Sequence, residues 1–378
     1  MEWLPKYNKL DPAQLQVIQQ ILGHPGNHFV EGFPGTGKSV VLAHAAMRCQ
    51  EQAHQEAIIL TYTNALVECI REGVRPLPVM TIDRFVDNLN APHKDCIFVD
   101  EAQDLRATSF RGTPTMATLQ QRANRLIFAA DSAQSLYDGT IPVATLKKDF
   151  GVEAQRCYQL RVNYRMTKKM LNVLDALFPD RKLEVSTGSL VDDVDVVYGD
   201  ARTQSEEYAW VFRKAKEYAE PRDPAVILFS SLNQMNDFAA TIASGLPTLI
   251  SRGTYEEKQQ SRQQFNLACR EKALPLRFVG NGVGEFREAD TEAMVYLMTM
   301  HSAKGLDFKT VFVPNCQTIP PDMRNLYYVA LSRARSNLFL SGNGYSAVKT
   351  ALKNLARIVP ATAAASAPST PDDSDFLF

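Results

Sequence analysis

Two short segments of the chain carry the residue types that bind and hydrolyse a nucleoside triphosphate. The first, Gly32–Ser39, reads GFPGTGKS and follows an apolar run, which is the pattern of a phosphate-binding P-loop. Its glycines let backbone N–H groups wrap phosphate oxygens, and the helix that follows adds a favourable dipole. Lys38 would neutralise the outer phosphates, and the Ser39 hydroxyl would hold Mg²⁺. The predicted ATP-binding residues of this segment are Gly32, Gly35, Thr36, Gly37, Lys38 and Ser39.

The second segment is a pair of carboxylates, Asp100 and Glu101, directly after the apolar run Ile97–Val99. Parallel strands bring their C-terminal ends to one edge of a sheet, so we expect Asp100 beside Ser39 and its metal ion. Glu101 is then placed to orient and deprotonate the attacking water. A solvated, acidic strand end is the alternative interpretation of this pair taken alone. Together the two segments predict a P-loop NTPase, and they do not distinguish a motor from a kinase or a switch.

Short runs of β-branched and aromatic residues alternate with helical patterns along the chain. This alternation predicts buried parallel strands covered by helices on both faces, an α/β fold. The expected strands are 28–32, 57–63, 96–102, 125–131, 157–161, 225–230, 293–300, 310–314 and 337–341, and the expected helices include 40–52, 64–72, 167–178 and 324–334. We expect a first domain at residues 1–152, a second at 153–358 with an irregular excursion near 251–290, and a disordered tail at 359–378.

Composition limits the kind of protein this is. The formal net charge of -1 excludes a uniformly basic surface that binds nucleic acid by charge alone, so any such contact must lie in a local groove. The six cysteines form no CxxC pair, which is typical of reduced thiols rather than of a disulfide framework or a zinc site. The N-terminal segment lacks a signal-peptide pattern, and no run reaches the roughly 18 apolar residues of a membrane span. We therefore expect a cytoplasmic protein.

Seven segments, which include the carboxylate pair, resemble in order the motifs of the UvrD/Rep-like helicases of superfamily 1. They are similar to the Q motif, motif Ia, the DEAQD box and motifs III, IV, V and VI, and lie at Leu10–Gln14, Thr61–Asn64, Asp100–Asp104, Ala130–Tyr137, Leu160–Arg165, Thr299–Phe308 and Tyr328–Arg335. The resemblance implies two RecA-like domains with an ATP cleft between them. It also implies a motor that moves on single-stranded nucleic acid, with DNA as the preferred substrate over RNA.

The resemblance assigns roles to individual residues. Arg165 and Arg333 would be arginine fingers from the second domain, since phosphoryl transfer needs charge stabilisation and a guanidinium suits phosphate oxygens. Gln134 would sense the γ-phosphate. The other implied ATP contacts are Gln14 and Tyr164 at the adenine and Gly305 and Asp307 near the phosphate and sugar. The implied nucleic-acid contacts are Tyr62, Asn64, Tyr137 and His301, of which the two tyrosines could equally be ordinary buried residues.

The chain departs from the family pattern in three ways. Val40 stands where the relatives have an arginine that packs over the base, which predicts a looser adenine site. Asp138–Thr140 replaces an aromatic residue and an arginine that stack on bases, and each stacked base contributes about 1–3 kcal/mol. The short stretches between motif Ia and the DEAQD box and between motifs IV and V leave no room for the large accessory domains of the relatives.

Two classes of function stay open after these departures. The first is an ATP-hydrolysing translocase or helicase on single-stranded DNA. The second is a regulatory ATPase subunit that gates a partner enzyme such as a nuclease. The C-terminal segment Asp372–Phe378 combines acids with aromatic and aliphatic residues and resembles the docking tip of single-stranded-DNA-binding proteins. The alternative interpretation is a frayed, solubilising end, since most chain termini are disordered.

Overall fold

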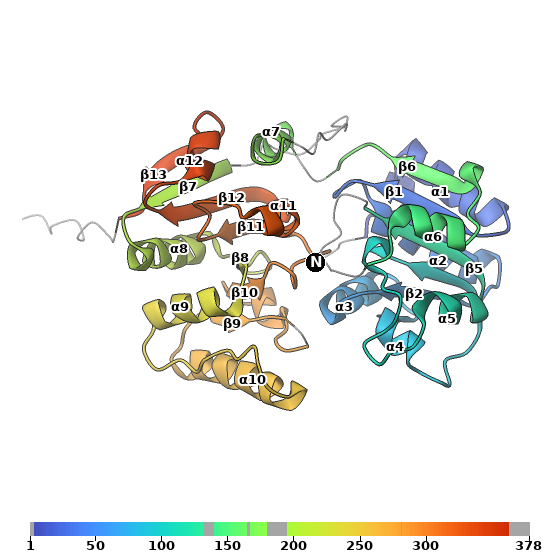
Figure 1. Cartoon of the computed structure of the whole chain (residues 1–378), viewed down its shortest axis with the longest axis horizontal. Helices are drawn as coiled ribbons and strands as arrows, with labels where there is room; N and C mark the ends of the chain where they lie inside the picture. The colour runs from blue at the N-terminus through green and yellow to red at the C-terminus, as the bar shows by residue number, and fades with distance from the viewer. Residues whose placement is uncertain (1–3, 132–139, 165–166, 180–194, 281, 363–378) are drawn as a thin grey trace, which may run out of the picture.

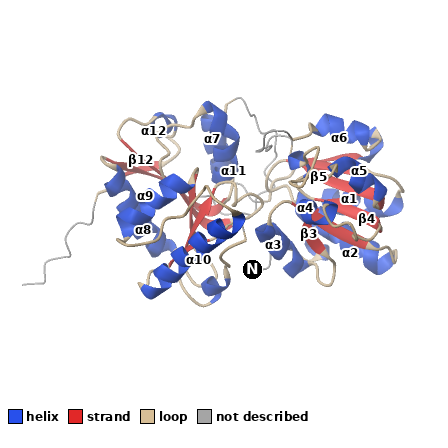
Figure 2. Ribbon diagram, turned by 60° about the horizontal axis from the view of Figure 1, so that its bottom comes forward, coloured by secondary structure: helices blue, strands red, loops and turns tan. Residues whose placement is uncertain are grey.

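The protein consists of two lobes that lie side by side, each built around one parallel β-sheet (Figure 1). The computed structural model describes residues 4–131, 140–164, 167–179, 195–280 and 282–362. Helices cover both faces of each sheet (Figure 2). The predicted α/β class with two parallel-sheet domains is therefore confirmed.

The first sheet has six parallel strands in the order β3-β2-β4-β5-β1-β6. They are β1 (His28–Gly32), β2 (Ala57–Thr61), β3 (Val79–Thr81), β4 (Lys94–Val99), β5 (Ala123–Ala130) and β6 (Cys157–Leu160). One face packs against α1 (Pro12–Gly23), α2 (Lys38–Gln52) and α3 (Asn64–Gly73), and the other against α4 (Ile82–Val86), α5 (Thr115–Gln121) and α6 (Val143–Asp149). Because both faces are covered, the central strands read as unbroken apolar runs.

The second sheet has seven parallel strands in the order β13-β7-β12-β11-β8-β10-β9. They are β7 (Asp195–Ala201), β8 (Ala225–Phe229), β9 (Leu276–Phe278), β10 (Val295–Thr299), β11 (Phe308–Val313), β12 (Ala334–Asn343) and β13 (Arg357–Pro360). One face packs against α7 (Lys168–Leu177), α11 (Arg324–Leu331) and α12 (Ala347–Ala351), and the other against α8 (Gln204–Tyr218), α9 (Leu232–Ile242) and α10 (Tyr255–Glu271).

Strand β6 corrects the predicted domain boundary. We expected residues 157–161 to begin the second domain, but β6 pairs with β1 and closes the first sheet, with Phe29 opposite Cys157. Helix α7 packs into the core of the second domain instead. A boundary at residue 153 is therefore too early, and we propose that it lies between Tyr164 and Lys168.

Two regions that we expected to be irregular are part of the second domain. Residues 251–290 form α10, which begins with a capping box between Thr254 and Glu257, and strand β9 at the sheet edge. The helix buries only a narrow stripe that includes Phe265 and Cys269. Its sequence is therefore mostly polar and lacks the clear apolar periodicity from which a helix is predicted. The predicted tail begins too early, since β13 runs to Pro360; its segment Asp372–Phe378 lies outside the described residues.

The remaining sequence-based expectations concern cysteines, metals and membranes. All six cysteines are free. In the described part of the chain, no group of three or more His, Cys, Asp or Glu side chains is arranged to hold a metal ion. None of the helices described there is both long and apolar enough to span a membrane.

Candidate nucleotide site and interdomain cleft

The P-loop connects the end of β1 to the start of α2. Gly35 and Gly37 both have φ of 81°, a conformation that favours glycine. A Cβ on Gly37 would lie 2.3 Å from Nε2 of Gln14, so a side chain there would displace the Gln14 amide from the loop. Lys38 Nζ donates to the carbonyl oxygens of Gly32 at 2.8 Å and Phe33 at 3.0 Å. The predicted loop therefore forms, and the Lys38 side chain is hydrogen-bonded to backbone carbonyl groups of the same loop.

Ser39 and Asp100 meet at the carboxyl ends of β1 and β4, as their spacing predicted. The Ser39 hydroxyl donates to Oδ2 of Asp100 at 2.6 Å. Burial and the neighbouring charge of Glu101 raise the pKa of Asp100. A hydroxyl and a carboxylate oxygen are hard ligands of the kind that Mg²⁺ prefers. The side chains present at this position therefore fit a magnesium ion.

Glu101 has an unusual backbone conformation, with φ of 55° and ψ of 39°. A residue other than glycine costs about 1–3 kcal/mol in such a conformation, and strain of this kind concentrates at functional sites. Gln103 Nε2 donates to the Glu101 carboxylate, and Gln103 Oε1 accepts from the backbone N–H of Asp131 at 2.9 Å. The amide of Gln103 thus fixes the carboxylate and ties the DEAQD box to the end of β5.

The charge on Glu101 is set by groups from both domains. Burial disfavours the charged carboxylate, but the positive charges of Lys304, Lys38 and Arg333 outweigh it. The pKa of Glu101 is consequently lower than its ordinary value. A carboxylate that stays ionised at neutral pH can accept a proton from water.

Lys304 crosses from the second domain into the first. Its Nζ lies 3.6 Å from Oε2 of Glu101 and forms a closer ion pair with Asp104. Both Lys304 and Asp104 are buried. Sequence analysis placed Lys304 in motif V without a role, because nothing in the sequence indicates a partner 200 positions away. Asp104 and Gln103 lie in the DEAQD box but were assigned no role, because their partners Lys304 and Asp131 lie outside that motif.

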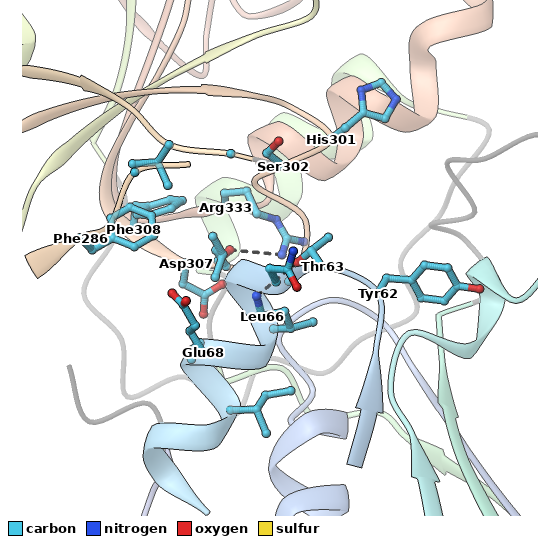
Figure 3. A pocket seen from close by; sticks show the side chains of 18 of the residues that line it. Tyr62, Thr63, Leu66, Glu68, Phe286, His301, Ser302, Asp307, Phe308 and Arg333 are labelled. Atoms are coloured by element: carbon cyan, nitrogen blue, oxygen red, sulfur yellow. Dashed lines mark hydrogen bonds between the residues drawn. The ribbon is translucent and has the colours of Figure 1, made fainter. Parts of the chain in front are cut away.

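Arg333 is buried where the second domain faces the P-loop. Its guanidinium donates to the carbonyl oxygens of Val329 at 2.8 Å and Leu306 at 3.3 Å. It lines one cleft with Lys38, Ser39 and Glu101. Figure 3 shows Arg333, Asp307, Thr63 and Leu66 gathered where the two domains meet. Three predicted site residues, Gln134, Tyr137 and Arg165, lie outside the described residues.

The Q motif and the second half of motif IV both contact the P-loop. Gln14 completes a capping box with Asp11 and donates from Nε2 to the carbonyl of Thr36 at 3.5 Å. Two further bonds to the loop come from motif IV: Asn163 Nδ2 donates to the carbonyl of Pro34 and Tyr164 N to that of Gly35, each at 2.8 Å. The Tyr164 ring is 37% exposed beside the loop. Sequence analysis assigned no role to Asn163, whose fixed amide holds motif IV in place.

A cleft of about 1790 Å³ runs between the domains. The predicted residues that line it away from the P-loop are Tyr62, Asn64, His301, Gly305 and Asp307. Tyr62 packs against the first-domain core, and its hydroxyl donates to the carbonyl of Asp104, while the residue also lines the cleft. Burial and the charge of Lys304 lower the pKa of His301. A Cβ on Gly305 would lie 2.9 Å from Cδ2 of Leu66, which shows how closely motif V approaches α3.

Two family models match the chain. The model of the Schlafen group 3 DNA/RNA helicase domain matches residues 26–215, half of the chain, and the UvrD-like helicase C-terminal domain matches residues 279–345. The chain belongs to the UvrD/Rep-like superfamily 1 helicases. The resemblance drawn from the motifs is thereby confirmed. Members of this family are ATP-hydrolysing enzymes. The P-loop, the DEAQD box and motif IV of this chain all lie within the first matched region.

Individual relatives match over limited lengths. The ATP-dependent DNA helicase PcrA of Staphylococcus aureus is 39% identical over 74 residues, covering 16% of this chain and 10% of PcrA. A probable DNA helicase of Mycoplasma pneumoniae is 24% identical over 272 residues, covering 65% of this chain and 42% of the relative. The solved structure of the PRRSV helicase aligns over 87% of this chain and 54% of its own, at 16% identity and a TM-score of 0.42. The chain thus spans less than half the length of either curated relative.

Proposed function

We propose that this chain hydrolyses ATP and couples hydrolysis to movement along single-stranded nucleic acid, with DNA as the preferred substrate over RNA. The observation that carries the proposal is the cleft in which Lys38 and Glu101 of the first domain lie with Arg333 of the second. Charge stabilisation around the transferred phosphoryl group is the main requirement of this chemistry, and here both domains supply it.

Each described residue of the site has a part in the reaction. Lys38 binds the outer phosphates, and Ser39 and Asp100 would hold Mg²⁺, which neutralises charge on the phosphate oxygens. Glu101 orients the water that attacks the γ-phosphorus and accepts its proton as the bond to ADP breaks. Arg333 stabilises the charge that develops on the phosphoryl group. Arg165 and Gln134 are proposed as the second finger and the γ-phosphate sensor.

The interdomain contacts offer a route from hydrolysis to movement. Lys304 and Gly305 of motif V contact the DEAQD box and α3, and the segments at Asn64 and His301 line the same cleft. A change in cleft width after hydrolysis would shift these segments relative to each other. Such rigid-body displacement of packed domains is a common form of switching.

ATP turnover by the purified chain tests the proposal, measured alone and with single-stranded DNA, single-stranded RNA and duplex DNA. We expect turnover to rise many-fold with single-stranded DNA. Turnover that ignores every nucleic acid would contradict a motor.

One observation favours a regulatory ATPase as the second candidate. Every residue between β2 and β4 is described, and this stretch forms only α3, β3 and α4, with no accessory domain. In that case cleft closure gates a partner enzyme, and turnover responds to the partner and not to DNA. The proposed docking role of Asp372–Phe378 belongs to this candidate, and deletion of that segment should then abolish the response to the partner.

A further inference from the structure

A tight hairpin at residues 107–115, the Phe110 hairpin, follows the DEAQD box. Thr115 N donates to the carbonyl of Ala107 at 3.0 Å, and Ser109 N donates to that of Thr113 at 2.9 Å. Gly112 turns the tip with φ of 85°. At this tip the side chain of Phe110 is 77% exposed.

The hairpin is anchored to α4 and to the residue that follows it. Asp87 accepts hydrogen bonds from the hydroxyls of Ser109 at 2.5 Å and Thr113 at 2.7 Å, and the bond from Ser109 lowers the pKa of Asp87. Asp83 accepts from the backbone N–H of Phe110 at 3.3 Å. These bonds fix the backbone beneath the ring. A large apolar side chain that is held out from a loop fixed by hydrogen bonds is available to contact a partner.

The ring faces the interdomain cleft. Phe110 lines the cleft with Asn64 and His301, the predicted nucleic-acid contacts. The guanidinium carbon of Arg106 lies 4.3 Å from the centroid of the Phe110 ring. The guanidinium therefore lies over one face of the aromatic ring and adds a permanent positive charge beside the ring's other face.

The start of the hairpin lies beside the segment that follows motif III. Arg106 forms a β-bridge with Thr140, and Ile141 N donates to the carbonyl of Leu105 at 2.7 Å. Thr140 ends the short stretch in which this chain lacks the aromatic residue and arginine expected from the family pattern. Phe110 and Arg106 are also an aromatic residue and an arginine, but they lie between β4 and α5 instead of after β5.

We propose that Phe110 and Arg106 form a base-stacking site for single-stranded nucleic acid. This inference rests on the proposed function, and it names the side chains that grip the strand. A flat ring with an adjacent guanidinium stacks on any base, and Arg71 and Arg75 of the same cleft supply charge for the phosphates. Phe110 is a single exposed ring rather than part of a broad apolar patch, and a ring paired with a guanidinium favours a nucleic acid over an apolar protein surface as the occupant.

The position of the site also connects it to the nucleotide. Only Leu105 separates Arg106 from Asp104, the carboxylate that binds Lys304 across the cleft. A strand stacked on Phe110 therefore contacts the segment that carries Glu101. Loss of the ring should reduce stimulation of ATP turnover by single-stranded DNA as well as affinity for it.

Fluorescence anisotropy tests the stacking site with a labelled oligothymidine and an abasic oligonucleotide of equal length. Phe110→Ala should weaken oligothymidine binding about 10-fold, the order expected for one lost stacking contact, and leave abasic binding nearly unchanged. Phe110→Tyr should restore affinity. The matched control is Tyr345→Ala, because Tyr345 is an 83% exposed ring outside the cleft lining.

A direct readout comes from Phe110→Trp, whose added fluorescence should be quenched by oligothymidine and not by the abasic strand. Wild-type protein that binds oligothymidine while Phe110→Ala binds it equally well would overturn the stacking site and leave the proposed function standing. An equal loss on the abasic strand would also overturn it. Wild-type protein that binds neither strand would contradict the proposed function itself, and the stacking site with it.

Discussion

Two neighbouring parts of the region between the domains are built from opposite kinds of surface. Beside Glu101, Lys304 and Asp104 are 3% and 0% exposed, whereas Phe110 in the cleft is 77% exposed. Removing one member of a buried, charged pair leaves the other without compensation, so both fold and chemistry suffer. Removing an exposed ring affects only what the ring binds. The comparison teaches that stability and nucleic-acid grip should be separable by mutation.

The largest effect is expected at Lys38. Lys38→Ala removes the cation that the P-loop offers to the outer phosphates, and it should abolish turnover. Steady-state ATP hydrolysis measures this, with Lys349→Ala as the control. Lys349 pairs with Asp200 at the surface of the second domain, away from the cleft lining. Substantial turnover by the Lys38 variant would show that the loop is not the site of hydrolysis.

The buried ion pair sharpens the comparison. Lys304→Met leaves Asp104 charged and buried, and should lower the free energy of unfolding by about 3–5 kcal/mol. Urea denaturation measures the loss. Lys349→Ala, which breaks a partly exposed pair, should cost only about 0–1 kcal/mol. Similar losses for the two variants would mean that the Lys304 pair is not insulated from water and that the contrast between the buried pair and the exposed ring is wrong.

The smallest effect is expected at the contact of motif V with α3. Gly305 and Gly344 have φ of 81° and 73°, so alanine is strained at both. A Cβ at Gly305 would also press on Leu66, whereas one at Gly344 would meet nothing within 4 Å. Gly305→Ala should therefore cost about 1 kcal/mol more than Gly344→Ala in thermal or urea unfolding. Equal costs would show that α3 and motif V do not constrain each other.

Much of the nucleotide site could be predicted because its determinants are local. The glycines, Lys38 and Ser39 lie within eight consecutive positions, and the placement of Asp100 follows from the geometry of parallel strands. The α/β class followed from the alternation of apolar runs with helical patterns.

What could not be predicted depends on contacts between distant segments. The position of β6 next to β1 is a matter of sheet order, which apolar runs do not encode. Helix α10 was not predicted because most of its residues are polar. Lys304 and Phe110 carry no signal in the sequence, because the first depends on a carboxylate in the other domain and the second on a hairpin fixed by Asp83 and Asp87.

The central claim is that the second domain completes the site of hydrolysis, and Arg333→Ala tests it most directly. Equilibrium binding of a labelled ATP analogue and kcat should be measured on the same preparation. We predict nearly unchanged binding with kcat reduced about 1000-fold or more, the effect of removing an arginine finger. An unchanged kcat, or loss of binding without loss of kcat, would contradict the claim.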